Sequence, residues 1–181
     1  IISEDPVART MDVADPVGLL MGIVPSTNPT STAIFKSIIA IKARNAIVFS
    51  PHPSAVKCTL KAATLMRDAA VEAGAPENII GCISMPSMPA TDELMHSKEV
   101  KMIIATGGPG MVKASYSAGK PALGVGAGNS PAYIERTANV QQAVTNIIAS
   151  KTFDYGTICA SEQSIICEEC NKDAVIAELK K

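Results

Sequence analysis

Residues 17–30 read VGLLMGIVPSTNPT, an apolar run that ends abruptly in a polar turn flanked by two prolines. The run from Val17 to Val24 has the length and composition of a buried β-strand. The turn ends in Asn and Thr, residue types that cap helices, and the pattern over about 31–43 has helical spacing. This stretch therefore predicts a strand, a loop and a helix, which is the first half of a βαβ unit.

The same alternation of short apolar runs and longer helical patterns continues along most of the chain. Further strands are expected at 45–49, 79–83, 101–105 and 121–125, and helices at about 54–73, at 91–97 and up to about 118. Such alternation is typical of a parallel sheet with helices on both faces. We predict an α/β fold with a doubly wound, Rossmann-like sheet that binds its ligands beyond the carboxyl ends of the strands.

The alternation changes after Asn129. Short strands are expected at 132–134 and 164–167, with a helix over about 139–151 between them. We place a domain boundary near 125–130. The chain is thereby divided into a Rossmann-like domain, residues 1–125, and the beginning of a second α/β domain, residues 126–181.

Composition and charge exclude several classes of protein. Hydrophobic residues make up 47% of the 181 residues, which excludes intrinsic disorder. The longest apolar run is far too short for a membrane helix. A net charge of −1, only three Phe, three Tyr and no Trp argue against a nucleic-acid partner. Five cysteines cannot all pair and no signal peptide is visible, so we expect a cytoplasmic protein. The initial Ile suggests a partial chain.

A glycine-rich turn at 107–110 follows one predicted strand and opens the next helix. Free N–H groups and the helix dipole favour a phosphate at such a position. The turn lacks the third glycine of the dinucleotide-binding fingerprint, because Lys113 stands in its place. An ordinary tight turn is the alternative interpretation.

The five cysteines have different sequence environments. Cys159 lies in a polar turn between a helix and a strand, where a nucleophile would be accessible. Cys58 and Cys82 lie in apolar runs and are expected to be small buried residues. In the Cys167-Glu-Glu-Cys170 motif the two carboxylates disfavour a thiolate, and no histidine is near enough in sequence to complete a zinc site. We predict no metal site.

Four motifs, in order along the chain, resemble the aldehyde dehydrogenase superfamily. They are PSTNPTS at 25–31, ATGGPGMV at 105–112, GVGAGN at 124–129 and SKTFD at 150–154, which continues to Ser164. The resemblance is greatest to the CoA-acylating branch, in particular to the aldehyde dehydrogenase half of bacterial bifunctional aldehyde-alcohol dehydrogenases. It covers about residues 15–167 and only the middle of a family member.

The resemblance implies two catalytic residues and a nicotinamide site. Asn28 matches the family's oxyanion-hole asparagine, and Cys159, three positions after Gly156, matches its nucleophile. Residues 1–14 would belong to an oligomerisation segment. The implied cofactor-binding residues are Pro25, Ser26, Thr27, Ser50, His52, Thr106, Gly107, Gly108, Gly110 and Gly126. From the residues alone, His52 between two prolines is most simply a turn residue.

Two departures from the hydrolytic members are informative. Where those enzymes carry a glutamate general base this chain has Val125, which cannot activate water. The resemblance therefore implies coenzyme A as the acyl acceptor and an aldehyde as the other substrate. Ser50-Pro51-His52-Pro53 replaces the lysine that binds the adenosine ribose, so NAD is expected and NADP remains open.

The resemblance also implies partners, and two alternative functions remain to be distinguished from the acylating one. We expect a homo-oligomer, with an alcohol dehydrogenase fused to or associated with the parent enzyme. One rival is a reductase of acyl phosphates in the same superfamily, which CoA dependence would distinguish. The other is a catalytically inactive fragment that binds nucleotide or assembles with itself.

Overall fold

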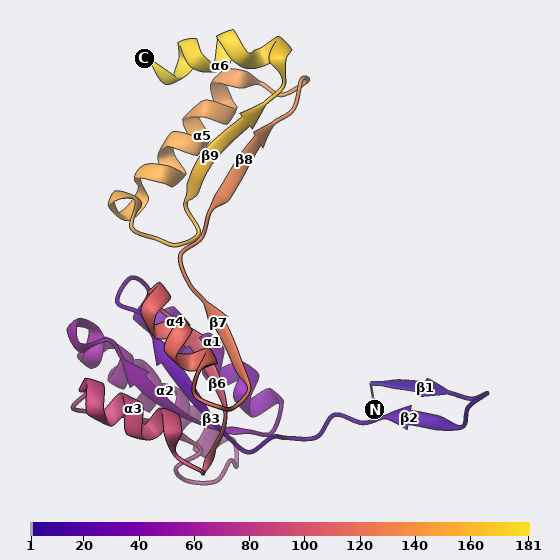
Figure 1. The fold of residues 1–181 in the computed structure, drawn as a ribbon, viewed down its shortest axis with the longest axis vertical. Helices are drawn as coiled ribbons and strands as arrows, with labels where there is room; N and C mark the ends of the chain where they lie inside the picture. The colour runs from indigo at the N-terminus through magenta and orange to yellow at the C-terminus, as the bar shows by residue number, and fades with distance from the viewer. Residues whose placement is uncertain (1) are drawn as a thin grey trace. The chain divides into compact units, whose positions relative to one another are not determined.

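The computed structural model describes residues 2–181 and divides the chain into two compact units, one ending at Gly126 and the other comprising Ala127–Lys181 (Figure 1). Each unit is described separately below. No helix among the described residues is both long enough and apolar enough to cross a membrane.

The first unit contains a five-stranded parallel sheet, which confirms the predicted doubly wound fold. Its strands stand in the order β5-β4-β3-β6-β7, so the chain moves outward from β3 first to one edge and then to the other. The carboxyl ends of the central strands β3 and β6 therefore meet at the point where the strand order reverses. The strands are β3 (Leu19–Val24), β4 (Ala46–Pro51), β5 (Ile80–Cys82), β6 (Val100–Thr106) and β7 (Ala122–Val125).

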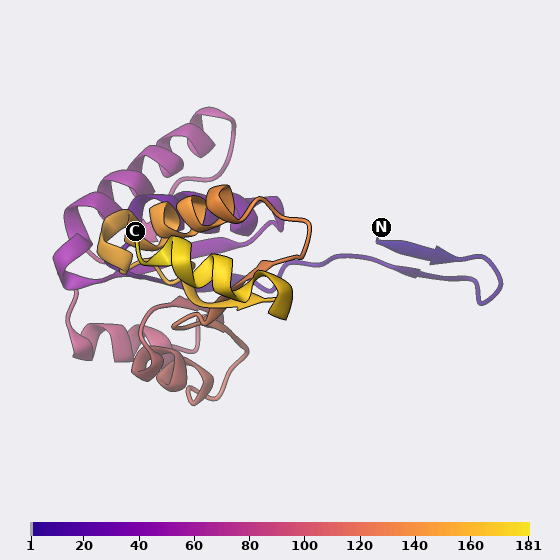
Figure 2. The ribbon, with the colours of Figure 1, turned by 90° about the horizontal axis from the view of Figure 1, so that it is seen from above.

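Helices cover both faces of this sheet, as Figure 2 shows. On one face lie α1 (Pro29–Lys42) and α2 (Val56–Glu72), the latter preceded by the 3₁₀ turn η1 (Pro53–Ala55). On the other face lie α3 (Met88–His96) and α4 (Pro109–Tyr116). Three of these helices have a proline at one of their first two positions, where its missing N–H costs nothing. Helices α1 and α3 start earlier than predicted.

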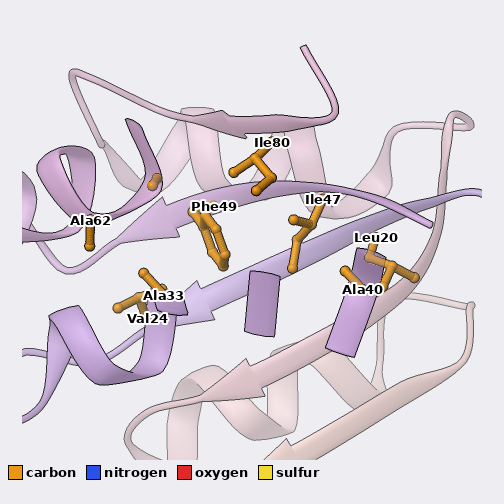
Figure 3. Packing of buried hydrophobic residues seen from close by; sticks show 9 residues of the cluster. Leu20, Val24, Ala33, Ala40, Ile47, Phe49, Ala62 and Ile80 are labelled. Carbon is orange, nitrogen blue, oxygen red and sulfur yellow. The ribbon is translucent and has the colours of Figure 1, made fainter. Parts of the chain in front are cut away.

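Phe49 of β4 is at the centre of the core on the α1 and α2 face. It is fully buried, and Figure 3 shows it among side chains from three strands and two helices. A β-carbon on Gly22 would lie 2.6 Å from the Phe49 ring, so the neighbouring strand needs a glycine at this position. The face is otherwise lined by small or aliphatic side chains, including Leu20, Val24, Ala33 and Ala62.

Alternate residues of the same strands form a second core on the α3 and α4 face. Met21 and Ile23 of β3 pack there with Ile103 of β6 and Met95 of α3. Because both faces of β3 and β6 are buried, the two strands are nearly continuous apolar runs, as parallel sheets require.

The first unit begins with a short antiparallel hairpin, β1 (Ser3–Asp5) and β2 (Thr10–Asp12), which the sequence reasoning did not predict. All six residues of the two strands are exposed. Asp5 makes the turn by accepting hydrogen bonds from the N–H groups of Val7 and Ala8. Each strand has only three residues and no run of alternating apolar side chains, so it carries no strand signal in the sequence.

The second unit pairs two parallel strands, β8 (Ser130–Ile134) and β9 (Glu162–Cys167), and packs two helices against them. The helices are α5 (Val140–Thr152) and α6 (Lys172–Leu179), and the 3₁₀ turns are η2 (Phe153–Gly156) and η3 (Glu169–Asn171). A small core of Ile134, Val144 and Val175 joins these elements.

Candidate active site

A cavity of about 330 Å³ opens at the carboxyl ends of β3, β4 and β6 in the first unit. Six of the predicted cofactor-binding residues line it, and none of its described lining residues is acidic. Those six are Pro25, Ser50, His52, Thr106, Gly107 and Gly108. Its size and its place at the topological switch point suit the diphosphate and adenosine portion of a dinucleotide. Ser26, Thr27, Gly110 and Gly126 are predicted residues outside this lining.

Ser50 and His52 shape the cavity wall at the end of β4. Ser50 is buried, and its hydroxyl is 2.8 Å from that of Thr91, which ties the strand to α3. His52 is the exposed N-cap of η1, where its Nδ1 accepts the backbone N–H of Ser54. In the neutral ring this bond leaves the proton on Nε2. His52 is therefore both the turn residue that its sequence context predicts and part of the cavity wall.

The glycine-rich turn opens α4 on the opposite wall. Gly108 is the N-cap of α4 and provides no side-chain cap for the amides of the first turn. A β-carbon on Gly108 or Gly110 would meet no protein atom within 4 Å, so space beside this backbone is open. Open space, free amides and the positive end of the helix dipole together fit a phosphate group.

Asn28 is the N-cap of α1, but its side chain makes no capping hydrogen bond. It is half-buried, and its Oδ1 accepts a hydrogen bond from the Thr27 hydroxyl at 3.2 Å. The side chain of an N-cap asparagine normally accepts a hydrogen bond from a backbone N–H of the first helical turn. Here the amide group remains free to donate a hydrogen bond elsewhere.

Cys159 lies in the turn between η2 and β9 and is half-buried rather than fully exposed. The chain reaches it through Asp154, Tyr155 and Gly156, three successive residues with positive φ. Two of these are not glycine, so the loop is held in a conformation that most sequences avoid. The Thr157 hydroxyl stabilises it by donating to the backbone and the carboxylate oxygens of Asp154.

Gly128 lies against the Cys159 loop within the second unit. The carbonyl oxygen of Cys159 lies inside the volume that a β-carbon on Gly128 would occupy. Only a residue without a side chain allows this approach. Gly128 belongs to the GVGAGN motif, but its sequence context does not assign it to the site, because its closeness to Cys159 depends on a contact between distant segments.

Polar contacts with α5 hold the chain immediately after Cys159. Ser150 donates to Glu162 at 3.1 Å, and Lys151 lies 3.5 Å from the Ser161 hydroxyl. The hydrogen bond from its own backbone N–H, and then that from Ser150, lower the pKa of Glu162. A carboxylate held in this way is a weaker base than an ordinary glutamate.

The other cysteines of the described chain differ in their exposure. Cys58 is exposed on α2, so the expectation that it is buried was wrong: its helix turns that position away from the core. Cys82 is half-buried, and burial raises its pKa to about 11. Within residues 2–181 no three His, Cys, Asp or Glu side chains gather as a metal ion would require.

Comparison with known proteins identifies the family. The family model for "Aldehyde dehydrogenase family" matches residues 1–181, the whole chain. The chain belongs to the aldehyde dehydrogenase family. The resemblance to this family that the sequence motifs predict is therefore confirmed.

Similar proteins in the aldehyde dehydrogenase family include a bifunctional enzyme, an acetylating aldehyde dehydrogenase and a propionaldehyde dehydrogenase. The chain is 55% identical over 175 residues to the bifunctional aldehyde-alcohol dehydrogenase AdhE of Escherichia coli, and covers 20% of that protein. An acetylating aldehyde dehydrogenase from Geobacillus thermoglucosidasius is 64% identical with a TM-score of 0.84, over 92% of this chain and 37% of that one. A propionaldehyde dehydrogenase from Rhodopseudomonas palustris, with bound propionyl-CoA, is 40% identical with a TM-score of 0.83, over 92% and 37%.

Proposed function

We propose that residues 1–181 form the nucleotide-binding and nucleophile-bearing part of a CoA-acylating aldehyde dehydrogenase. The reaction is aldehyde + CoA + NAD⁺ ⇌ acyl-CoA + NADH + H⁺, with acetaldehyde or another short aldehyde as substrate. The observation that carries the proposal is Val125, which ends β7 with an exposed aliphatic side chain where hydrolytic members have a glutamate. The acylating relatives described above support it.

Cys159 would attack the aldehyde carbon as a thiolate. The new carbon–sulfur bond converts the carbonyl oxygen into the oxyanion of a thiohemiacetal, and a preorganised donor is needed where this charge appears. The free amide of Asn28 and the backbone N–H of Cys159 are the proposed donors. A bound nicotinamide would supply the hydride acceptor, and loss of the hydride from the thiohemiacetal carbon would leave an acyl thioester on Cys159.

The thioester must then pass to a nucleophile other than water. Val125 has no group that could take a proton from water, and the hydrogen bonds that lower the pKa of Glu162 make that carboxylate a poor substitute. The CoA thiol loses its proton to solvent and attacks the Cys159 thioester as a thiolate, the acyl–sulfur bond to the enzyme breaks, and the Cys159 thiolate is released. These residues therefore favour transfer of the acyl group over its hydrolysis.

The cavity at the strand ends is the proposed nicotinamide cofactor site. Its open backbone at Gly108 suits the diphosphate, while Ser50, His52 and Pro25 form the wall on the β3 and β4 side. We propose NAD as the cofactor, with NADP as the alternative to be tested by titration. Ser26, Thr27, Gly110 and Gly126 are proposed to contact the cofactor from outside the cavity lining.

The same proposal includes assembly and cellular location. The exposed hairpin of β1 and β2 carries an exposed apolar side chain at Met11, with Val7 and Val13 beside it, and we propose that it pairs with another subunit of a homo-oligomer. A cytoplasmic location and an alcohol dehydrogenase fused to or associated with the parent enzyme complete the proposal.

CoA dependence tests the proposed function. The full-length enzyme containing this chain is incubated with acetaldehyde and NAD⁺, with CoA or with inorganic phosphate as the acyl acceptor. We expect stoichiometric acetyl-CoA and NADH with CoA, and no acyl phosphate with phosphate. Turnover that requires phosphate, or a product that is only free acetate, would contradict the proposal and favour an acyl-phosphate enzyme or a hydrolytic one.

A further inference from the structure

Lys36 is a lysine that the proposed reaction does not use, and it is completely buried on α1. Its Nζ donates one hydrogen bond to the carbonyl oxygen of Ile23 at 2.7 Å and another to that of Ile104 at 2.8 Å. Ile23 belongs to β3 and Ile104 to β6, two adjacent strands of the sheet. One nitrogen atom thus connects a helix to both central strands.

A buried amine in this environment is costly for stability. Burial lowers the pKa of Lys36 to about 7, and no carboxylate of the described chain contributes to that shift. Removing a cation from water without a counter-ion costs free energy that two carbonyl contacts repay only in part. An apolar side chain of similar length would fill the same space without this cost, so stability alone does not account for a lysine.

The three elements that Lys36 connects carry the loops of the proposed site. β3 leads through Val24 and Pro25 into the Asn28 turn, and α1 begins directly after Asn28. β6 leads from Ile104 into Thr106 and the glycine-rich turn. A change in the spacing of β3, β6 and α1 would therefore move Asn28 relative to the backbone proposed to hold the cofactor diphosphate.

We propose that Lys36 is a positioning residue, which fixes the Asn28 turn relative to the Thr106–Gly108 turn by bonding to β3 and β6 from α1. The role is indirect, because the side chain is buried away from the cavity lining. The consequence of this role for turnover rests on the proposed function. The consequence for the geometry of the two turns does not.

The test compares Lys36→Met with Lys42→Met, a matched change of an exposed lysine in the last turn of the same helix. Amide hydrogen exchange is measured in both variants of the full-length enzyme. Lys36→Met should speed exchange in residues 24–28 and 106–108 on the order of tenfold, the effect of one lost hydrogen bond on local opening. Lys42→Met should leave both segments unchanged, and neither variant should lower the unfolding temperature.

Steady-state kinetics provides the second readout. Lys36→Met should lower kcat roughly 100-fold, the scale for a misplaced catalytic group, while KM for the aldehyde changes little. Lys36→Gln, which keeps two N–H donors on a shorter side chain, should give intermediate values of exchange and kcat.

Three results would overturn the positioning role: normal exchange in both turns of Lys36→Met, a lower unfolding temperature with normal kcat, or failure of both Lys36 variants to fold. The last two would show that Lys36 serves stability. If the unsubstituted enzyme had no CoA-dependent activity, the proposed function would fail by itself, and hydrogen exchange would still decide the role of Lys36.

Discussion

The carbonyl oxygen of Cys159 occupies the space in which Gly128 would carry a β-carbon. The glycine thus defines how closely β8 and the nucleophile loop approach each other within the second unit. Gly128→Ala should push the loop away and slow alkylation of Cys159 by iodoacetamide. It should also lower kcat on the order of 100-fold, because a small displacement of a reacting group lowers the reaction rate steeply.

Gly81→Ala is the control for this prediction. A β-carbon on Gly81 would meet Val48 at ordinary van der Waals distances, so this variant should behave like the unsubstituted protein. Equal alkylation rates in the two variants would mean that the loop accommodates the methyl group and that Gly128 has no role in placing Cys159.

Cys159 should react with iodoacetamide faster than any other cysteine of the native protein, and Cys159→Ser should abolish aldehyde oxidation in the full-length enzyme. Reactivity at neutral pH depends on the thiolate rather than on exposure alone. Cys58 and Cys170 are the most demanding comparisons, because both are exposed whereas Cys159 is half-buried. Peptide mass spectrometry after a brief labelling pulse gives the order of reaction, and Cys58 reacting first would count against the assignment.

Asn28→Ala should act on the transition state, because the oxyanion that its amide would contact exists only after attack by Cys159. We expect kcat to fall roughly 100-fold with KM for the aldehyde little changed, the usual effect of losing one oxyanion donor. Thr30→Ala, an exposed position in the first turn of the same helix, is the matched control. An effect on KM alone would show that Asn28 binds substrate rather than the transition state.

The parallel sheet could be predicted from the sequence because its central strands are buried on both faces. The run from Val17 to Val24 contains β3, and each of the other predicted strands overlaps an observed one. Hydrophobic patterning reports burial, which is most complete in β3, β4 and β6, whereas the edge strand β7 has apolar residues that are exposed in this chain. The exposed hairpin at residues 3–12 has no such pattern, and for that reason it was not predicted.

The contacts that shape the site were less accessible to sequence reasoning. Lys36 looks like an ordinary charged residue of an amphipathic helix, and only the fold reveals that its Nζ lies between two strands. Gly128 and Cys159 are far apart in sequence, and their contact follows from the pairing of β8 with β9. The family and the candidate catalytic residues could be inferred from motifs, but the distances between segments could not.

The buried Lys36 should make the stability of the chain depend on pH. The folded-state pKa of about 7 is below the unfolded value of 10.5, so between these values the unfolded state binds more protons. The contribution of Lys36 to the free energy of unfolding should therefore rise from pH 7 toward pH 10, by at most roughly 1.4 kcal/mol per pH unit, and be constant below pH 7.

Urea unfolding of the 181-residue chain at several pH values measures this dependence. Lys36→Met should remove the rise between pH 7 and pH 10, whereas Lys42→Met should retain it. The same slope in Lys36→Met and in the unsubstituted chain would show that the folded state does not perturb Lys36.

The acylating assignment makes a kinetic prediction that depends on Val125. With aldehyde and NAD⁺ but without CoA, the full-length enzyme should release one burst of NADH, about one equivalent per active site, and then stop at the Cys159 thioester. Addition of CoA should restart turnover. Val125→Glu should introduce slow hydrolysis if the backbone directs the new carboxylate toward the thioester. Val125→Gln, whose side chain has the same shape as that of glutamate but no basic group, should introduce none.

Glu162 follows the nucleophile loop closely in the chain, and its carboxylate could undermine this prediction. Its backbone N–H and the Ser150 hydroxyl both hold it in the ionised form, so it should be a weak base for water. Glu162→Gln should therefore leave the burst unchanged. Steady release of free carboxylic acid without CoA, lost in Glu162→Gln, would mean that Glu162 activates water and that the enzyme is hydrolytic in spite of Val125.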